Sequence, residues 1–161
     1  MSLRIENARP DQTGLILDFI RKLADYDQMA HKVAATEEGL RHWLFGDKSV
    51  ADVVIAYWDA APVGFALFYP TISTFSGSPG LYLEDLYVEP DHRGHGVGKA
   101  LLAYLARVAT DRGYGRLEWS VLTWNQPAIG FYERLGAVPR NEWYVYRLSG
   151  DALAKLAAGP R

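Results

Sequence analysis

Two groups of residues within one short stretch, 81–109, could do chemistry. Two acids, Glu84 and Asp85, interrupt an apolar run that is typical of a β-strand. Shortly after them, three glycines alternate with other residues directly before a helical pattern. A carboxylate in apolar surroundings can accept a proton from a substrate, and the first turn of a helix presents backbone N–H groups. The stretch therefore predicts an anion site close to a site for acid–base chemistry.

The glycines, at 94, 96 and 98, predict a phosphate-binding loop. The N-terminus of a helix carries partial positive charge, and residues without a Cβ let a phosphate approach the backbone. Arg93 adds a cation at the same place. A strand-to-helix turn without a ligand would usually need one glycine, so three within five residues favour a phosphate ligand.

The spacing of this loop differs from two common nucleotide-binding motifs. A Rossmann fingerprint reads G-x-G-x-x-G, and Lys99 stands where its third glycine belongs. A Walker A loop needs a hydroxyl residue after its Gly-Lys pair, but Ala100 follows Lys99, and Arg93 occupies the position of the first glycine. Neither a dinucleotide site nor a P-loop is expected.

The composition indicates a single domain, 1–161, with a real hydrophobic core. Of the 161 residues 49% are hydrophobic, and the net charge of -2 does not suggest a nucleic-acid binder or a polybasic membrane patch. The chain has no cysteine, which excludes disulfides, thiolate metal sites and cysteine nucleophiles. His92 and His95 lie at the glycine loop without a partner ligand, so no metal is expected.

The chain is expected to be soluble and cytoplasmic. Its first twelve residues lack the apolar segment of a signal peptide, and no apolar run approaches the roughly 20 residues that span a bilayer.

An order of strands and helices is expected to position these residues. The patterns predict six strands, at 3–8, 49–58, 61–70, 81–90, 115–123 and 142–149. They predict four helices, at 10–27 with Asp11 as its cap, at 36–45, from 97 to about 108, and at 125–136 with Asn125 as its cap. Residues 71–80 have the composition of a loop. The order indicates a mixed α/β fold with a central βαβ unit, whose strands run parallel.

Three blocks together resemble the GNAT N-acetyltransferase superfamily, and within it the spermidine/spermine (diamine) acetyltransferase branch. They are "KLADYDQM" at 22–29, "YLEDLYVEPDHRGHGVG" at 82–98 and "WNQPAIGFYERLGA" at 124–137. The similarity runs from about Arg4 to Leu156, nearly the whole chain. It implies a mixed central sheet with splayed fourth and fifth strands, flanked by helices, and a homodimer with its sites near the interface.

The resemblance also implies an activity and the residues that carry it out. The activity is transfer of an acetyl group from acetyl-CoA to a primary amine of a small molecule, by direct attack. Glu84 matches the base, acting directly or through water, and Tyr132 matches the acid that protonates the CoA thiolate. The residues that match contacts to the amine are Tyr26, Asp27, Glu84 and Asp85, where Asp27 replaces the usual Glu. Those that match contacts to CoA are Leu86, Tyr87, Val88, Arg93, Gly94, His95, Gly96, Val97, Gly98, Lys99 and Asn125.

The residues alone leave alternatives open. A regular strand would point Glu84 and Asp85 to opposite faces of the sheet. Tyr132 could be a core aromatic, although it cannot share a face with Phe131, and Asn125 could be a simple helix cap. A CoA or nucleotide sensor without catalysis is the alternative function, but such a sensor needs neither Glu84 nor Tyr132. The acceptor could be a polyamine, a thialysine-like amino acid or another small primary amine.

Overall fold

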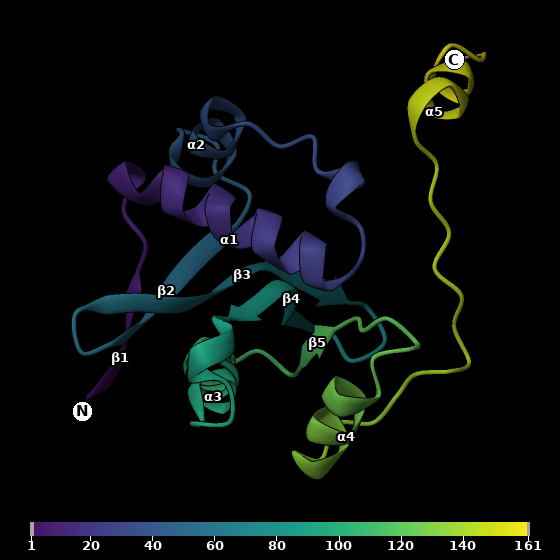
Figure 1. Cartoon of the computed structure of the whole chain (residues 1–161). Helices are drawn as coiled ribbons and strands as arrows, with labels where there is room; N and C mark the ends of the chain where they lie inside the picture. The colour runs from purple at the N-terminus through teal and green to yellow at the C-terminus, as the bar shows by residue number, and fades with distance from the viewer. Residues whose placement is uncertain (1, 161) are drawn as a thin grey trace. The chain divides into compact units, whose positions relative to one another are not determined.

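The computed structural model describes residues 2–160. The first part of the chain forms five strands and three α-helices, which Figure 1 labels: β1 (Leu3–Asn7), α1 (Thr13–Tyr26), α2 (Glu37–Phe45), β2 (Asp52–Trp58), β3 (Ala61–Ser73), β4 (Ser78–Val88), α3 (Val97–Asp111) and β5 (Leu117–Trp119). The last part forms two more helices, α4 (Gln126–Arg134) and α5 (Gly150–Ala157).

The strands form one sheet in the order β1-β2-β3-β4-β5. Each of the first four strands pairs with the next in antiparallel fashion, whereas β5 runs parallel to β4. The connection from β4 to β5 passes through α3, which confirms the predicted βαβ unit and the mixed α/β fold.

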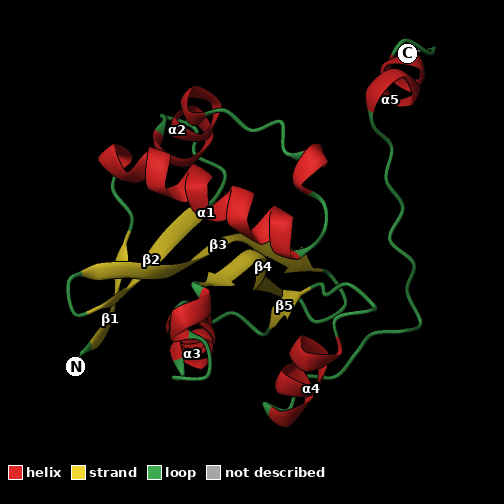
Figure 2. Ribbon diagram, viewed as in Figure 1, coloured by secondary structure: helices red, strands yellow, loops and turns green. Residues whose placement is uncertain are grey.

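Helices cover both faces of this sheet, with α1 and α2 on one face and α3 on the other (Figures 1 and 2). On the first face, Phe19 of α1 stacks on Phe65 of β3 with ring centroids 5.3 Å apart. On the second face, α3 buries Val97, Leu101 and Leu105 almost completely. The apolar stripe of each helix therefore sets the face of the sheet that the helix covers.

Strand β5 pairs with β4 over only three residues, Leu117 to Trp119 opposite Leu81 to Leu83. Strand β4 continues to Val88 without β5 beside it. This confirms the predicted splay of the fourth and fifth strands. It leaves one edge of β4 open from residue 84 to residue 88.

The contacts within the chain divide it into two units, 1–122 and 123–161. The first holds the sheet with α1, α2 and α3. The second holds α4, a segment at 137–149 without helix or strand, and α5 (Figure 2). That the whole chain acts as a single domain stays a prediction.

The sequence-based boundaries need four corrections in the first unit. Asp11 lies inside a 3₁₀ turn (Pro10–Gln12) and does not cap α1. Strands β3 and β4 extend into the predicted loop 71–80, so that only 74–77 form the turn and Ser73 pairs with Ser78. Strand β5 is shorter than 115–123, because its ladder with β4 ends at the splay. Strand β2 begins at Asp52, later than expected.

The predicted last strand, 142–149, is wrong. These residues form no ladder, and four successive side chains from Trp143 to Tyr146 are exposed. Alternation and aromatic content indicate strand propensity, but a strand also needs an edge with which to pair. Helix α5 follows instead, and no helix was expected there.

Among residues 2–160, no helix is both long and apolar enough to cross a membrane.

Candidate active site

A β-bulge in β4 determines how the two acids are presented. Asp85 pairs with Leu67 of β3, and Leu83 pairs with the next β3 residue, Phe68, so that Glu84 is an extra residue without a partner in the ladder. A bulge bends its strand and redirects side chains. Glu84 contacts the hydroxyl of Tyr69 on β3, whereas Asp85 lies opposite the buried Leu67. The alternation expected of a regular strand therefore does not apply at Glu84 and Asp85, because the ladder is irregular there.

Glu84 is exposed, and its carboxylate accepts a hydrogen bond from Tyr69 at 3.1 Å. Tyr69 lies directly opposite Tyr82 in the β3–β4 ladder, with the two ring centroids 5.4 Å apart. Tyr82 in turn shares a hydrogen bond of 2.7 Å with Ser120, just past the end of β5. One hydroxyl thus binds the extra residue of the bulge, and a second hydroxyl pair joins β4 to the end of β5.

Asp85 lies deeper than Glu84, on the face of the sheet that α1 covers. Burial, together with the nearby charges of Glu84 and Asp27, raises the pKa of Asp85 to about 6. Burial also raises the pKa of Asp27, which follows the last residue of α1. The structure therefore brings together three of the predicted amine-binding acids.

These acids form a negative cluster without a positive partner. Among the described residues, none of Asp27, Glu84 and Asp85 takes part in an ion pair. Asp27 also lies at the C-terminal end of a helix, where the helix dipole disfavours negative charge. A bound ammonium group would relieve this repulsion, so the cluster suits a cationic ligand.

The glycine loop has the backbone geometry of an open turn before a helix. Gly94 and Gly96 have φ angles of 78° and 84°, a left-handed conformation that favours glycine. Gly96 is the N-cap of α3 and leaves the first N–H groups of that helix without a side-chain cap. An added Cβ at either glycine would meet nothing within 4 Å, so a ligand has room to approach the backbone.

Arg93, which begins the loop, points back toward α1. Its guanidinium lies 5.0 Å from the ring centroid of Tyr26 and 5.4 Å from that of Tyr87, and its Nε donates to the carbonyl of Val88 at 2.9 Å. The loop thus adjoins Tyr26, the neighbour of Asp27. His95 also touches the loop backbone, because its Nδ1 is 2.9 Å from the carbonyl oxygen of Arg93.

Leu86, Tyr87 and Val88 lie on the open edge of β4. They pair with Ala66, Phe65 and Gly64 of β3 on the other side. In an antiparallel pair, alternate residues direct their backbone groups away from the partner strand. This stretch therefore presents backbone groups to the gap that β5 leaves.

Asn125 and Tyr132 belong to the second unit. Asn125 is buried and caps α4 by accepting a hydrogen bond from the N–H of Ala128 at 3.4 Å, which confirms the predicted cap. Tyr132 lies on α4, half-buried, with its ring centroid 5.6 Å from that of Phe131. Their predicted contacts with CoA stay predictions.

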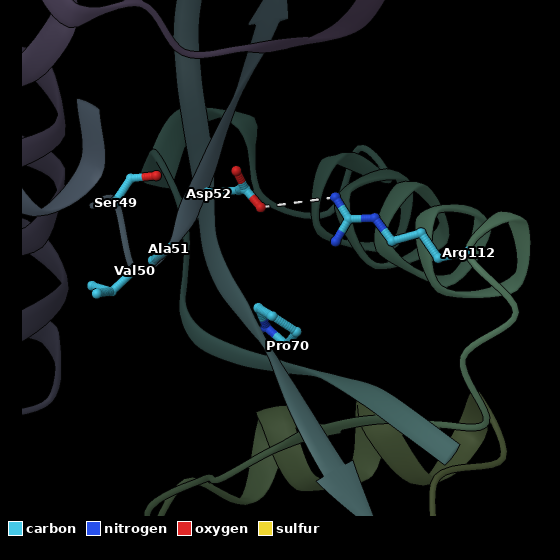
Figure 3. Close-up of a pocket in the computed structure, with 6 residues that line it drawn as sticks. All are labelled: Ser49, Val50, Ala51, Asp52, Pro70 and Arg112. Atoms are coloured by element: carbon cyan, nitrogen blue, oxygen red, sulfur yellow. Dashed lines mark ion pairs between the residues drawn. The ribbon is translucent and has the colours of Figure 1, made fainter. Parts of the chain in front are cut away.

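Figure 3 shows a hollow elsewhere in the first unit, lined by Ser49, Val50, Ala51, Asp52, Pro70 and Arg112. It contains an ion pair of 3.8 Å between Asp52 and Arg112. Arg112 is the C-cap of α3, and the glycine loop precedes the N-terminus of the same helix. The length of α3 separates the hollow from the loop by about 22 Å. None of the sequence-predicted site residues lines this hollow.

Sequence reasoning missed Tyr69, Tyr82 and Ser120. The first two are ordinary strand residues in the sequence, and only the register across the bulge brings Tyr69 to Glu84. Ser120 lay within the predicted strand 115–123, and no sequence signal placed it beside Tyr82.

The match to a family model covers most of the chain: residues 17–137 match the model described as the acetyltransferase (GNAT) family. The chain is 37% identical to the thialysine N-epsilon-acetyltransferase of Bos taurus over 95% of its own length and 96% of that protein. It is 30% identical to the L-ornithine N5-acetyltransferase of Arabidopsis thaliana, with 97% of the chain and 88% of that protein covered.

A solved structure also resembles the whole chain. The integron cassette protein from the mobile metagenome of V. cholerae has a TM-score of 0.81 at 30% identity, over 99% of both chains.

Proposed function

The chain belongs to the acetyltransferase (GNAT) family, and from this premise we propose that it transfers the acetyl group of acetyl-CoA to a primary amine of a small molecule. The observation that carries the proposal is the cluster of Asp27, Glu84 and Asp85, three acids without an ion-pair partner among the described residues. The cluster suits a cationic amine, and the open glycine loop nearby suits the phosphates of CoA.

The acceptor we propose is the terminal amine of a basic amino acid. Two relatives that align over most of the chain are named for such acceptors, thialysine and L-ornithine. A polyamine is the second candidate, because the three sequence blocks resemble the diamine acetyltransferase branch. Both kinds of acceptor carry more than one charged nitrogen, which three neighbouring carboxylates can bind.

The loop 93–99 is proposed to bind the pyrophosphate of CoA through backbone N–H groups. The left-handed backbone of Gly94 and Gly96 supports this role, because it turns the chain so that the start of α3 is open. Backbone N–H groups among Leu86, Tyr87 and Val88 are proposed to hold the pantetheine arm and to polarise the acetyl carbonyl, as an oxyanion hole does. Asn125 would contact the CoA arm from the start of α4.

The proposed chemistry needs one proton acceptor and one proton donor. Acetyl-CoA supplies the acetyl group as a thioester. Glu84 accepts a proton from the ammonium group, directly or through water, because a lysine-like amine with a pKa near ~10.4 is protonated at neutral pH. The neutral nitrogen then attacks the carbonyl carbon, so that an N–C bond forms and the C–S bond breaks. Tyr132 donates its hydroxyl proton to the departing thiolate, while the amide nitrogen loses its extra proton to solvent.

A panel of amines tests the function directly. Thialysine, ornithine, lysine, putrescine and spermidine are each incubated with acetyl-CoA and the protein, and release of the CoA thiol is followed. We expect the amino acids to give the highest kcat/KM. Release with polyamines alone would overturn the proposed acceptor. Binding of acetyl-CoA without turnover of any amine would favour a sensor over an enzyme.

The change Tyr132→Phe tests the proposed proton donor. It keeps the ring and removes only the hydroxyl, so acetyl-CoA should bind as before while kcat falls at least roughly tenfold, the lower range of general-acid effects. The readouts are calorimetric affinity for acetyl-CoA and kcat with the best acceptor. Full activity, with chemistry shown to be rate-limiting, would contradict the role of Tyr132.

We also infer a homodimer and a cytoplasmic location. The exposed run Trp143 to Tyr146 supports the dimer, because exposed apolar patches commonly mark protein–protein contacts. The proposed co-substrate, acetyl-CoA, is compatible with that location because it is present in the cytoplasm.

A further inference from the structure

A hydrogen bond joins the proposed base to a residue to which the family resemblance gives no role. The hydroxyl of Tyr69 on β3 donates to Oε2 of Glu84 at 3.1 Å. Tyr69 is half-buried against the core beneath α1 and α2, whereas Glu84 is exposed. The hydrogen bond therefore joins the packed ring of Tyr69 to the exposed side chain of Glu84.

Glu84 needs such a contact because of its place in the bulge. It has no partner in the β3–β4 ladder and no ion pair among the residues that the structure describes. A free glutamate side chain has many rotamers, and fixing it costs up to about 2 kcal/mol of entropy. A base must lie within hydrogen-bond reach of the proton that it accepts, so unrestricted rotation would lower the rate.

Tyr69 remains a donor throughout the neutral range. Burial, followed by the charge of Glu84, raises the pKa of its hydroxyl to about 12. The ring is also held in place, because it lies opposite Tyr82 with 5.4 Å between the centroids. The hydroxyl is therefore available to hold the carboxylate of Glu84 in one orientation.

We propose that Tyr69 is a positioning residue, which holds the carboxylate of Glu84 in the orientation needed to accept the proton of the acceptor amine. This proposal rests on the proposed function of Glu84. The other titratable groups that act on this hydrogen bond are Asp85 and Tyr82 on β4, and Asp27 after α1 acts on Asp85 in turn.

The test compares Tyr69→Phe with Tyr82→Phe. Both changes remove one hydroxyl from two neighbouring tyrosine rings, but the Tyr82 hydroxyl pairs with Ser120 and not with Glu84. Tyr69→Phe should lower kcat about tenfold, the order expected for a hydrogen bond to a charged group, and leave the KM for acetyl-CoA unchanged. Tyr82→Phe should cause a clearly smaller loss of kcat, because its hydroxyl does not contact Glu84.

A double-mutant cycle shows whether Tyr69 acts through Glu84. In a Glu84→Gln background, Tyr69→Phe should lower kcat by less than about twofold. Tenfold losses that multiply in the double variant would overturn the proposal. An equal loss of kcat in Tyr69→Phe and in Tyr82→Phe would also overturn it.

A titration that does not depend on activity separates this proposal from the proposed function. The ultraviolet difference between the parent and Tyr69→Phe follows the ionisation of Tyr69 alone. In a Glu84→Gln background, that transition should move to lower pH, since a carboxylate no longer opposes the phenolate. An unmoved transition would overturn the contact even if the protein acetylates amines. A moved transition in a protein that acetylates no amine would leave the contact standing and remove the proposed function.

Discussion

At the scale of single residues, the fold disfavours the ionised form of Asp85 and raises the pKa of its carboxyl. Its side chain lies in the sheet beneath α1, and its charge is close to the charges of Glu84 and Asp27. The folded protein therefore binds the proton of Asp85 more tightly than the unfolded chain does. An ammonium group would remove this repulsion by pairing with the carboxylate. The ionised carboxylate can therefore destabilise the ligand-free protein and still favour binding of a cationic ligand.

Asp85→Asn should stabilise the protein without substrate. The pKa of Asp85 is about 6 in the fold against an ordinary 3.8, so the ionised carboxylate lowers stability increasingly between these pH values and fully above them. The variant should therefore gain up to about 3 kcal/mol in free energy of unfolding at pH 7.5. The gain should vanish below about pH 4, where the carboxyl is protonated in both states.

Urea unfolding at pH 7.5 and at pH 3.5, at one protein concentration, measures this difference. Asp91→Asn, the same change at an exposed position, is the control and should gain nothing. Equal stability of Asp85→Asn and the parent at pH 7.5 would contradict the burial of this charge. The KM for the amine should rise in the same variant.

The sequence identifies these residues but does not give their arrangement. The carboxylates of Glu84 and Asp85 are visible because acids are rare in apolar strands. The bulge at Glu84, beside the hydrogen bond from Tyr69, depends on the register with β3, and register is a property of two strands together. Tyr69 could not be selected from the sequence for the same reason.

At the scale of elements, the three loop glycines divide into two kinds. Gly94 and Gly96 have positive φ, so the turn itself requires glycine. Gly98 is the second residue of α3 with an ordinary helical backbone, and an added Cβ would come no closer than 3.9 Å to Val88. The fold without ligand therefore does not require glycine at position 98. Close approach of a ligand is the remaining explanation for a glycine there.

Gly98→Ala should thus separate folding from binding. Alanine is the better helix former by up to about 1 kcal/mol, so the thermal midpoint should stay or rise. Affinity for CoA should fall at least roughly tenfold, because the new methyl group would stand where the pyrophosphate is proposed to lie. Gly14→Ala is the matched control, since Gly14 is also the second residue of its helix, α1. Calorimetry that finds equal CoA affinity in Gly98→Ala and Gly14→Ala would contradict the assignment of the loop.

The elements that the sequence predicts well are those whose pattern is local. Helix α3 has its apolar stripe, and α4 has Asn125 at its start and Gly136, with φ of 93°, after its end. The turn at 74–77 and the length of β5 depend on pairing with other strands. Composition alone therefore gave wrong boundaries for both. The prediction of a strand at 142–149 is wrong for the same reason. Its residue pattern indicates a strand, but the pattern does not show whether another strand is available to pair with it.

At the scale of the whole molecule, the family prediction is confirmed by the match over residues 17–137. The contacts within one chain do not explain why the segment at 142–149 exposes large apolar side chains. Tyr144 and Tyr146 are 88% and 93% exposed, and Trp143 is 65% exposed. Large aromatic side chains contribute most to interfaces when they are buried there, which makes this segment the best candidate for contact with a second copy.

Light scattering should therefore give twice the 18.0 kDa of one chain. The double change Tyr144→Ser and Tyr146→Ser removes two aromatic rings from each copy, and burial of each contributes about 2 kcal/mol, so the dimer should weaken by at least about a hundredfold. At micromolar concentration the variant should move toward the monomer mass.

Phe75→Ser, at an aromatic that is 97% exposed in the turn between β3 and β4, is the control and should stay dimeric. A parent protein that is monomeric at working concentration would contradict the dimer. A Phe75→Ser variant that dissociates equally would show that the segment 142–149 is not what holds the two copies together.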